Sequence, residues 1–319
     1  LETVTMKDKQ VSFTKTDVTG EKEVEGATIT VKEKETDKIV DEWISGKEDH
    51  KIKGLEERKT YILSEIVTPE DYVKATDIEF TVTEEKVNQE VNMKDKQVKV
   101  SKTTAGGDEV VGASMQIRDE FGNIIDEWIS DGKEHYATGL VEGKKYILHE
   151  DLAPTGFNLA NDFEFEVSKE KENQTVEMID TLNEVSKVDE KGNLLKGAEM
   201  TVTSNKTKNI IDKWISGQHI FDVTDEMKSQ LKETGKAEGM YVDDEDSTVQ
   251  YSIAKNKGKD DYTVMFVEDG ITTYTNIDLD GNETRHMIQG LEAGEEYVLK
   301  ETKTPNGYAT FKTQTFTAE

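Results

Sequence analysis

The sequence predicts an all-β protein that consists of β-sandwiches in tandem, and three observations carry this prediction. Segments in which apolar and polar residues alternate recur along the chain, as at 26–31 and 113–117, and such alternation is typical of half-buried strands. Turn-forming residues such as Gly106 and Gly107 separate these segments. A set of short motifs also returns three times in the same order, which indicates three copies of one domain.

Each repeat opens with a lysine in an alternating strand and later carries a Tyr-x-Leu-x-Glu segment. Two repeats then end in Val-x-Met-x-Asp, and a further copy of that segment lies at the start of the chain. The first and second lysines are 87 residues apart, and the second and third are 85 apart. The motifs supply Lys15, Lys102 and Lys187, Glu65, Glu150 and Glu301, and Asp95, Asp180 and Asp8.

Three sandwiches in series predict a rod, and the third has an insertion. From the tryptophan of each repeat to its glutamate there are 22 residues in the first two repeats but 87 in the third. Thr224 is a helix N-cap candidate before two acidic residues, and 262–275 predicts a hairpin with Asp269-Gly270 at its turn, so the insertion is an α+β subdomain. The predicted boundaries are 1–8 (closing strand of a preceding or neighbouring domain), 9–95, 96–181 and 182–319, with the insertion at 217–285.

Composition excludes several classes of protein. The formal charge of −28 and the absence of a basic stripe argue against nucleic-acid binding. No apolar run reaches transmembrane length, so membrane insertion of this segment is not expected. With no cysteine, disulfides and cysteine-based zinc sites are excluded. Neither a catalytic triad nor a phosphate or nucleotide motif is found, so we expect no cofactor and no enzyme with turnover.

Other repeated residues are predicted to be structural. We expect the tryptophans and the motif tyrosines to lie in the cores. A histidine four residues before a Gly-Leu pair also recurs, at His50, His135 and His286, and we expect it to be a strand or turn residue, because no second histidine and no acid cluster repeats alongside it. Asp278, Asp280 and Asn282 resemble part of a calcium loop, but the remaining spacing is absent, and a solvated loop is the favoured interpretation.

Taken in order, these motifs resemble the Cna B-type (SpaA-like) domains of Gram-positive surface adhesins and pilins. The second repeat carries the resemblance best, from Val98 to Lys102 through Val111 to Arg118 and Ala153 to Gly156, up to Val176 to Asp180, and it is similar to the parent domain of the SpyCatcher and SpyTag pair. The resemblance implies a prealbumin-like, Ig-like sandwich whose first and last strands are joined by an isopeptide bond, in a protein of the cell surface or cell wall.

Carried over to this sequence, the resemblance implies a Lys15–Asp95 bond beside Glu65 and a Lys102–Asp180 bond beside Glu150. Asn88 and Asn92 are rival partners in the first repeat, but aspartate is the residue that aligns in both repeats. Burial among apolar side chains favours a neutral lysine and a protonated carboxyl, and a neutral glutamate can then move protons while the amine attacks. Each such reaction happens once.

The third repeat has Lys187 and Glu301 but no closing aspartate, whereas Val4 to Asp8 matches the missing segment. We therefore expect residues 1–8 to complete the third domain of a neighbouring copy, with Lys187 joined to Asp8 of that copy. The chain could equally be one period of a long tandem array. The predicted function is a structural stalk, pilus or fibre segment; the alternative is an adhesin module whose insertion binds a host glycan or protein.

Overall fold

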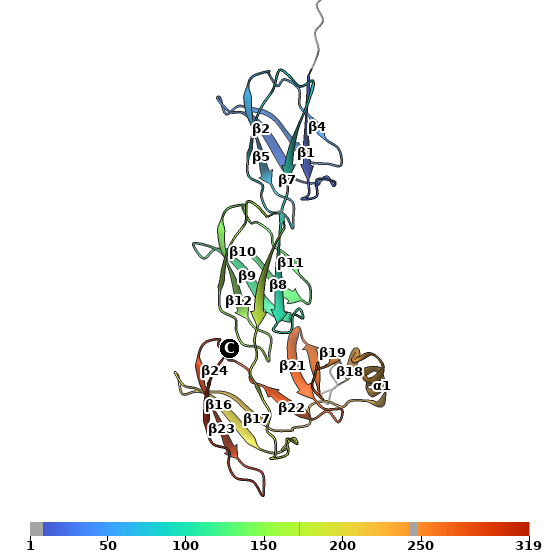
Figure 1. Ribbon diagram of the computed structural model, residues 1–319, viewed down its shortest axis with the longest axis vertical. Coiled ribbons are helices and arrows are strands. Elements are labelled where there is room, and N and C mark those ends of the chain that lie inside the picture. The colour runs from blue at the N-terminus through green and yellow to red at the C-terminus, as the bar shows by residue number, and fades with distance from the viewer. Residues whose placement is uncertain (1–8, 172, 243–247, 319) are drawn as a thin grey trace, which may run out of the picture.

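The structure is a computed structural model that describes residues 9–171, 173–242 and 248–318. Two β-sandwiches lie end to end along the long axis, and a third sandwich with a lateral extension follows them (Figure 1). Strands dominate and one helix is present among the described residues. The predicted all-β class is confirmed.

In the first sandwich a four-stranded sheet in the order β3-β2-β5-β6 faces a three-stranded sheet in the order β4-β1-β7. All pairings are antiparallel except that of the first and last strands, β1 and β7, which run parallel. Inward residues of both sheets, such as Phe13, Ile29 and Met93, form the core. The strands are β1 (Gln10–Thr16), β2 (Thr28–Glu33), β3 (Ile39–Ile44), β4 (His50–Lys51), β5 (Thr60–Val67), β6 (Ile78–Thr81) and β7 (Asn88–Lys94).

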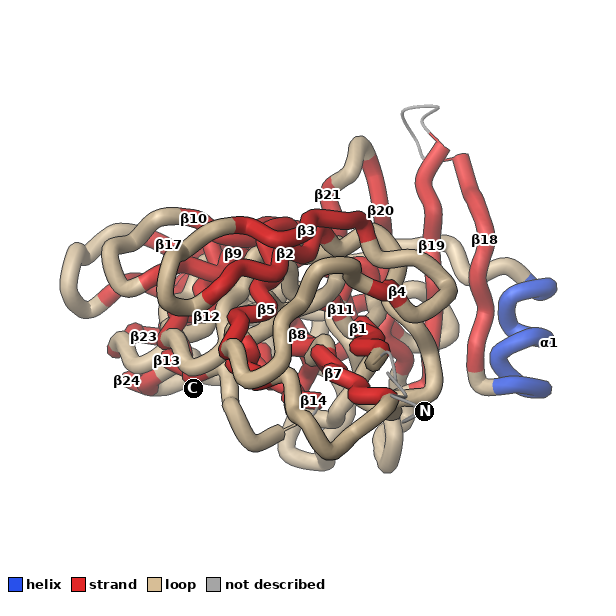
Figure 2. Tube along the Cα trace, turned by 90° about the horizontal axis from the view of Figure 1, so that it is seen from above, coloured by secondary structure: helices blue, strands red, loops and turns tan. Residues whose placement is uncertain are grey.

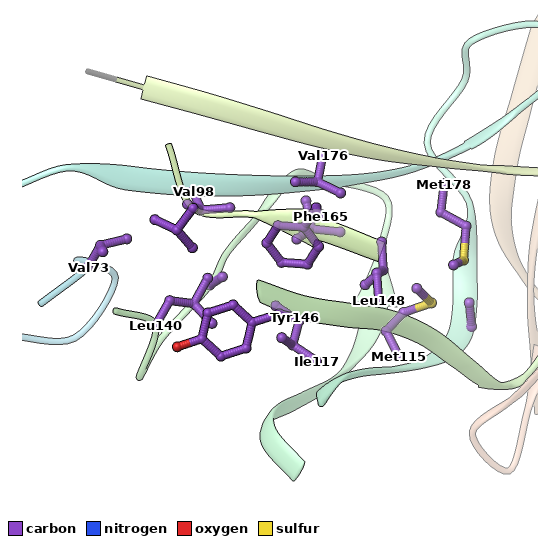
Figure 3. Close-up of a cluster of buried hydrophobic side chains, with 14 residues drawn as sticks. Val73, Val98, Met115, Ile117, Leu140, Tyr146, Leu148, Phe165, Val176 and Met178 are labelled. Carbon is purple, nitrogen blue, oxygen red and sulfur yellow. The ribbon is translucent and has the colours of Figure 1, made fainter. Parts of the chain in front are cut away.

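The second sandwich repeats this topology, with sheets in the order β10-β9-β12-β13 and β11-β8-β14. Figure 3 shows its core, in which Met115, Tyr146 and Leu148 of one sheet meet Val176 and Met178 of the other. The strands are β8 (Gln97–Thr104), β9 (Val111–Asp119), β10 (Ile124–Asp131), β11 (His135–Tyr136), β12 (Lys145–Leu152), β13 (Phe163–Glu166) and β14 (Asn173–Asp180).

The third sandwich keeps the four-stranded sheet, in the order β17-β16-β23-β24. Its other sheet is different, because β15 and β22 continue into the insertion as a six-stranded sheet in the order β15-β22-β21-β20-β19-β18. Among the described residues, nothing pairs with β15 on the side where a closing strand lies in the first two sandwiches. The strands are β15 (Glu184–Val185), β16 (Glu199–Ser204), β17 (Ile210–Ile215), β22 (Glu283–Met287), β23 (Glu296–Lys303) and β24 (Gln314–Thr317).

The insertion consists of one helix and four strands, and seen down the long axis it lies to one side of the sandwiches (Figure 2). Thr224 caps the helix by accepting a hydrogen bond from the Met227 amide. Asp269 and Gly270 both adopt positive φ at the predicted hairpin turn, as a two-residue turn of this kind requires. The elements are α1 (Asp225–Thr234), β18 (Lys236–Val242), β19 (Thr248–Lys255), β20 (Tyr262–Glu268) and β21 (Ile271–Ile277).

The insertion also contacts the second sandwich. The Tyr274 amide donates a hydrogen bond to the Thr155 carbonyl, with N and O 3.2 Å apart. The Tyr274 hydroxyl accepts from the Val111 amide at 3.2 Å, and its ring packs edge-on against Phe157 with centroids 5.0 Å apart. The insertion therefore contributes to the contact between the second and third sandwiches.

Candidate cross-linking sites

In the first sandwich Lys15, Glu65 and Asp95 meet in the core between the two sheets. Lys15 lies on β1 and Glu65 on β5, both at inward positions of the strand alternation, and Asp95 follows β7 directly. Each residue is at most 2% exposed. The Lys15 Nζ contacts Asp95 Oδ1 and lies 3.1 Å from Glu65 Oε1. An amine and two carboxyl groups are thus brought together away from water.

The second sandwich has the same arrangement. Lys102 Nζ contacts Asp180 Oδ1 and lies 3.1 Å from Glu150 Oε1, and all three residues are again at most 2% exposed. In both sandwiches the lysine strand runs parallel to the strand that carries the aspartate, with Lys102 opposite Met178 and Thr104 opposite Asp180. This register places the aspartate two residues beyond the lysine's partner.

Each glutamate is oriented by the backbone. Glu65 Oε2 accepts a hydrogen bond from the Ala75 amide at 2.9 Å, and Glu150 Oε2 accepts one from the Ala160 amide at 2.8 Å. The other oxygen of each glutamate faces the lysine and pairs with its Nζ at 3.1 Å. This oxygen can therefore exchange a proton with the amine.

Burial determines the protonation of the aspartates. It raises the pKa of Asp95 to about 7; the Lys15 ammonium opposes this shift and the charge of Glu65 adds to it. The pKa of Asp180 is likewise raised to about 7 by burial and by the charge of Glu150, against the effect of Lys102. Near neutral pH each aspartate is therefore partly a neutral acid.

The third sandwich has an incomplete version of this site. Lys187 Nζ lies 3.5 Å from Glu301 Oε1, and the lysine side chain is 13% exposed. Glu301 Oε2 accepts a hydrogen bond from the Phe311 amide, and Lys187 Nζ stands 5.2 Å from the centroid of the Phe311 ring. Asp8, the predicted partner of Lys187, lies outside the described residues.

The rival partners in the first repeat point away from the lysine. Asn88 and Asn92 are exposed positions of β7, and Asn92 Oδ1 accepts a hydrogen bond from the Thr16 hydroxyl at 3.0 Å. Because strand residues alternate between faces, Asn88 and Asn92 share the outward face of β7. The geometry thus brings Asp95 to Lys15 and not the asparagines.

An aspartate that the sequence analysis did not single out repeats with each histidine. Each histidine Nε2 is bonded to the aspartate two residues before the tryptophan, at 2.9 Å in the first two sandwiches and 3.0 Å in the third. Each imidazole also stacks on that tryptophan, with centroids 3.9–4.2 Å apart. The signal was in the sequence as Asp-x-Trp. The triplets are Asp41, Trp43 and His50; Asp126, Trp128 and His135; and Asp212, Trp214 and His286.

Asp278, Asp280 and Asn282 form a closed turn. The Asp278 carboxylate accepts hydrogen bonds from the amides of Asp280 and Asn282, both at 2.9 Å, and from the Asn282 side chain. The same Asp-x-x-Gly-Asn turn occurs at 119–123 and 189–193, which explains the resemblance to a calcium loop. Within the described ranges, no cluster of three or more potential metal-ligating side chains occurs, and no helix is long and apolar enough to cross a membrane.

The fold and its repeated buried sites define a class of tandem prealbumin-like sandwich domains. The sequence model of the SpaA prealbumin-like fold domain matches residues 9–97 and 96–182, together more than half of the chain. The chain therefore belongs to this family. No curated protein matches the sequence.

Several solved structures are similar to the chain. The Bacillus anthracis TIE protein is 16% identical with a TM-score of 0.24, over 98% of this chain and 48% of its own, so the chain spans about half the length of that protein. The shaft pilin SpaA of Lactobacillus rhamnosus GG is 13% identical with a TM-score of 0.26, over 54% of this chain and 96% of its own. A streptococcal ancillary pilin is 13% identical with a TM-score of 0.25, over 98% and 95%.

Proposed function

We propose that this chain is a segment of an extracellular stalk, pilus or fibre whose domains lock themselves with Lys–Asp isopeptide bonds. The supporting observation is the pair of buried trios, Lys15 with Glu65 and Asp95, and Lys102 with Glu150 and Asp180. Each bond would join the first strand of a sandwich to its last. Tension applied through these two strands would then pass along a covalent link, and the strands between them would carry little load.

The chemistry is a condensation that the buried glutamate assists. Overall, an ammonium and a carboxylate become a neutral amide and one water. Two protons pass from the nitrogen to the departing oxygen, and Glu65 relays them. Glu65 first takes a proton from the Lys15 ammonium and passes it to the Asp95 carboxylate; the neutral amine then attacks the carboxyl carbon, and Glu65 moves the second proton from the nitrogen to the departing hydroxyl, which leaves as water. Holding the groups together contributes roughly 7–11 kcal/mol through proximity, and the product removes the cost of burying charges. The amide remains part of the chain and only water is released, so each site reacts once and the chain does not act as an enzyme.

The test is the intact mass of the full folded chain. Two bonds make the described part of the chain lighter by two waters, and peptide mapping should recover Lys15 joined to Asp95 and Lys102 joined to Asp180. An unmodified mass in folded wild-type protein would overturn the proposal.

For the third sandwich we propose a bond between Lys187 and Asp8 of a neighbouring copy. Lys187 lies beside Glu301, and the free edge of β15 among the described residues is where a closing strand runs in the first two sandwiches. Purified chain should form a ladder of covalent multimers on a denaturing gel, and Lys187→Ala should abolish the ladder. A single monomer band from wild-type chain under these conditions would refute linkage between copies.

A second candidate function is an adhesin module in which the insertion binds a host ligand. The observation that favours it is a set of exposed apolar side chains, Met240, Val242 and Ile271, at the end of the insertion sheet. Replacing these three with serine should abolish retention of a host protein or glycan while leaving the isopeptide masses unchanged. Retention that survives the triple substitution would exclude this surface as the binding site.

A further inference from the structure

The loop that follows the proline of each repeat forms the joint to the next sandwich. In the first repeat the Lys74 amide donates to the Leu140 carbonyl of the second sandwich at 2.9 Å, and Lys74 pairs in parallel with Val141. In the second repeat the Leu159 amide donates to the Leu291 carbonyl of the third sandwich at 3.1 Å, and Leu159 pairs in parallel with Glu292. Two successive joints are thus built in the same way.

In the third repeat the corresponding loop, 305–312, is exposed. Thr310 stands where Lys74 and Leu159 stand, five residues after the proline, and it is exposed. Tyr308 and Phe311 are 49% and 36% exposed. The loop joins β23 to β24 at the end of the molecule opposite the first sandwich (Figure 1). A loop that is covered at both internal joints is therefore uncovered here.

The opposite half of the joint is uncovered at the other end of the molecule. At the internal joints the receiving residues are fully buried: Leu140 is 0% exposed and Leu291 is 1% exposed. Their counterpart in the first sandwich, Leu55 of the same Gly-Leu pair, is only partly buried. Ile52, the counterpart of the buried Ile288, is also only partly buried. The outer end of the first sandwich thus presents an apolar surface of the kind that the internal joints cover.

Charged groups at this outer end also match an internal joint. Lys96 pairs with Glu142 at the first joint, and Lys9 pairs with Glu57 at the outer end of the first sandwich, with Nζ and Oε1 2.9 Å apart. Each lysine also donates to a backbone carbonyl of the segment that precedes the last strand of its sandwich. The receiving half of the joint is therefore already formed around Lys9.

The exposed loop carries a charge that complements this receiving half. At the first joint the Thr76 hydroxyl bonds to Glu142. The residue at the position of Thr76 in the third repeat, seven after the proline, is Lys312, which is exposed. Docked in the same geometry, Lys312 would face Glu57, so an opposite-charge contact would replace a neutral one.

We propose that loop 305–312 docks on the outer end of the first sandwich of a second copy of this chain, with Thr310 beside Glu56 and Lys312 beside Glu57. The joint rests on the head-to-tail association proposed above, but it needs no isopeptide bond. It supplies the non-covalent register that would bring the neighbour's Asp8, which precedes Lys9 as Asp95 precedes Lys96, toward Lys187.

Because the chain has no cysteine, disulfide trapping can test this contact without background. Neighbouring strands lie about 4.7–4.9 Å apart, which is within the Cα–Cα range of about 4.4–6.8 Å that a disulfide can bridge. Full-length Thr310→Cys and Glu56→Cys chains would be mixed under mild oxidation and run on a non-reducing gel. Docked thiols meet at an effective concentration in the millimolar range, so we expect a reducible heterodimer to form roughly tenfold faster than in the control mixture.

The matched control is Thr310→Cys mixed with Glu21→Cys, because Glu21 is also an exposed glutamate of the first sandwich but lies in the turn beyond the far end of β1. Equal trapping in the two mixtures overturns the proposal. As a second measurement, Lys312→Glu on the Thr310→Cys chain should slow trapping, and Glu57→Lys on the partner chain should restore it; trapping indifferent to both changes also overturns it. The intact mass of each chain shows separately whether the Lys15 and Lys102 bonds formed, so failure of the joint and failure of cross-linking are told apart.

Discussion

The second and third sandwiches share a lysine and a glutamate in the same positions but differ in what surrounds them. Around Lys102 the parallel partner strand β14 is present and the lysine is 2% exposed. Around Lys187 the described residues supply no such strand, and the lysine side chain is 13% exposed. Within the described part of the chain, Lys102 meets two carboxyl groups and Lys187 one.

This difference shows that the closing strand does more than carry the aspartate. It also covers the lysine and thereby creates the dry environment in which the pKa of the aspartate is raised. The lysine and glutamate alone form an ordinary, partly solvated ion pair. In the proposed reaction, a sandwich of this kind would react only once its last strand is in place, so completion of the fold would precede formation of the bond.

The largest effect is expected from Lys102→Ala. It should raise the mass by one water, after correction for the substitution, and lower the stability of the second sandwich. Lys102 and Asp180 are 78 residues apart in sequence, and a cross-link that closes a loop of that length stabilises the folded state by about 4–5 kcal/mol. Intact-mass spectrometry would measure the change in mass, and calorimetry would measure the loss of stability.

The matched control for this prediction is Lys99→Ala on the same strand. Lys99 is partly exposed and pairs with Glu134 at 2.8 Å, so its loss should cost under about 1 kcal/mol. If Lys99→Ala and Lys102→Ala lowered the melting temperature equally, the second sandwich would contain no bond that matters for stability.

Glutamine substitutions of the glutamates should sharpen the contrast between the sandwiches. Glu65→Gln removes the group that exchanges protons, so formation of the Lys15–Asp95 bond should slow by about 10²–10⁴-fold. Glu301→Gln should leave the mass of the monomer unchanged apart from the substitution, because no second carboxyl meets Lys187 among the described residues. The rate of bond formation would be followed by intact-mass measurements at successive times after refolding, with the Lys102–Asp180 bond as internal reference. If the Lys15–Asp95 bond formed in Glu65→Gln at the wild-type rate, the glutamate would be dispensable.

Much of the site could be predicted from sequence because the residues repeat. The lysine, glutamate and aspartate recur at inward positions of alternating strands, and the helix and hairpin of the insertion follow from Thr224 and from Asp269-Gly270. A single occurrence of Lys15 or Asp95 would have been unremarkable, since charged side chains are seldom buried. Periodicity, not local pattern, identified these residues.

Contacts between elements without a local sequence signature could not be predicted. The hydrogen bond of His50 to Asp41 joins β4 to β3; the recurring Asp-x-Trp segment shows that these residues repeat together, but neither segment alone specifies that the two side chains converge. Tyr274 gives no sign in the sequence that it packs on the second sandwich, and Val73 gives none that it enters the next domain's core. The contacts of Tyr274 and Val73 depend on how complete domains are placed, which strand alternation does not encode.

The histidines offer a pH-dependent comparison. Burial opposes protonation of His286, but hydrogen bonds to Asp212 and Glu283 prevail and raise its pKa to about 8. The folded state therefore binds the proton of His286 more tightly than the unfolded state. The protonated histidine contributes fully to the free energy of unfolding below about pH 6.5, and this stabilisation is lost as the pH rises through 8. Its size is about 2 kcal/mol.

Fluorescence of Trp214, which stacks on His286 with centroids 4.1 Å apart, would report unfolding of the third sandwich in a Trp43→Phe, Trp128→Phe background. In this background, the free energy of unfolding of the third sandwich should fall between pH 6 and pH 9, and it should fall less when His286→Gln is added. The same pH dependence with and without His286 would show that the histidine does not contribute.

The smallest effect concerns the joint, where Val73 and Ala309 occupy the same position after their prolines. Val73 is 1% exposed and packs in the core of the second sandwich together with Val98 and Leu140 (Figure 3), whereas Ala309 is exposed. Val73→Ala should destabilise the second sandwich by about 1.5 kcal/mol, since two methyl groups leave a packed core. Ala309→Val should change the stability of the third sandwich by less than about 0.5 kcal/mol. Unfolding monitored through Trp128 in a Trp43→Phe, Trp214→Phe background would locate the loss, and a loss confined to the first sandwich, to which Val73 belongs in sequence, would mean that the joint does not couple neighbouring domains.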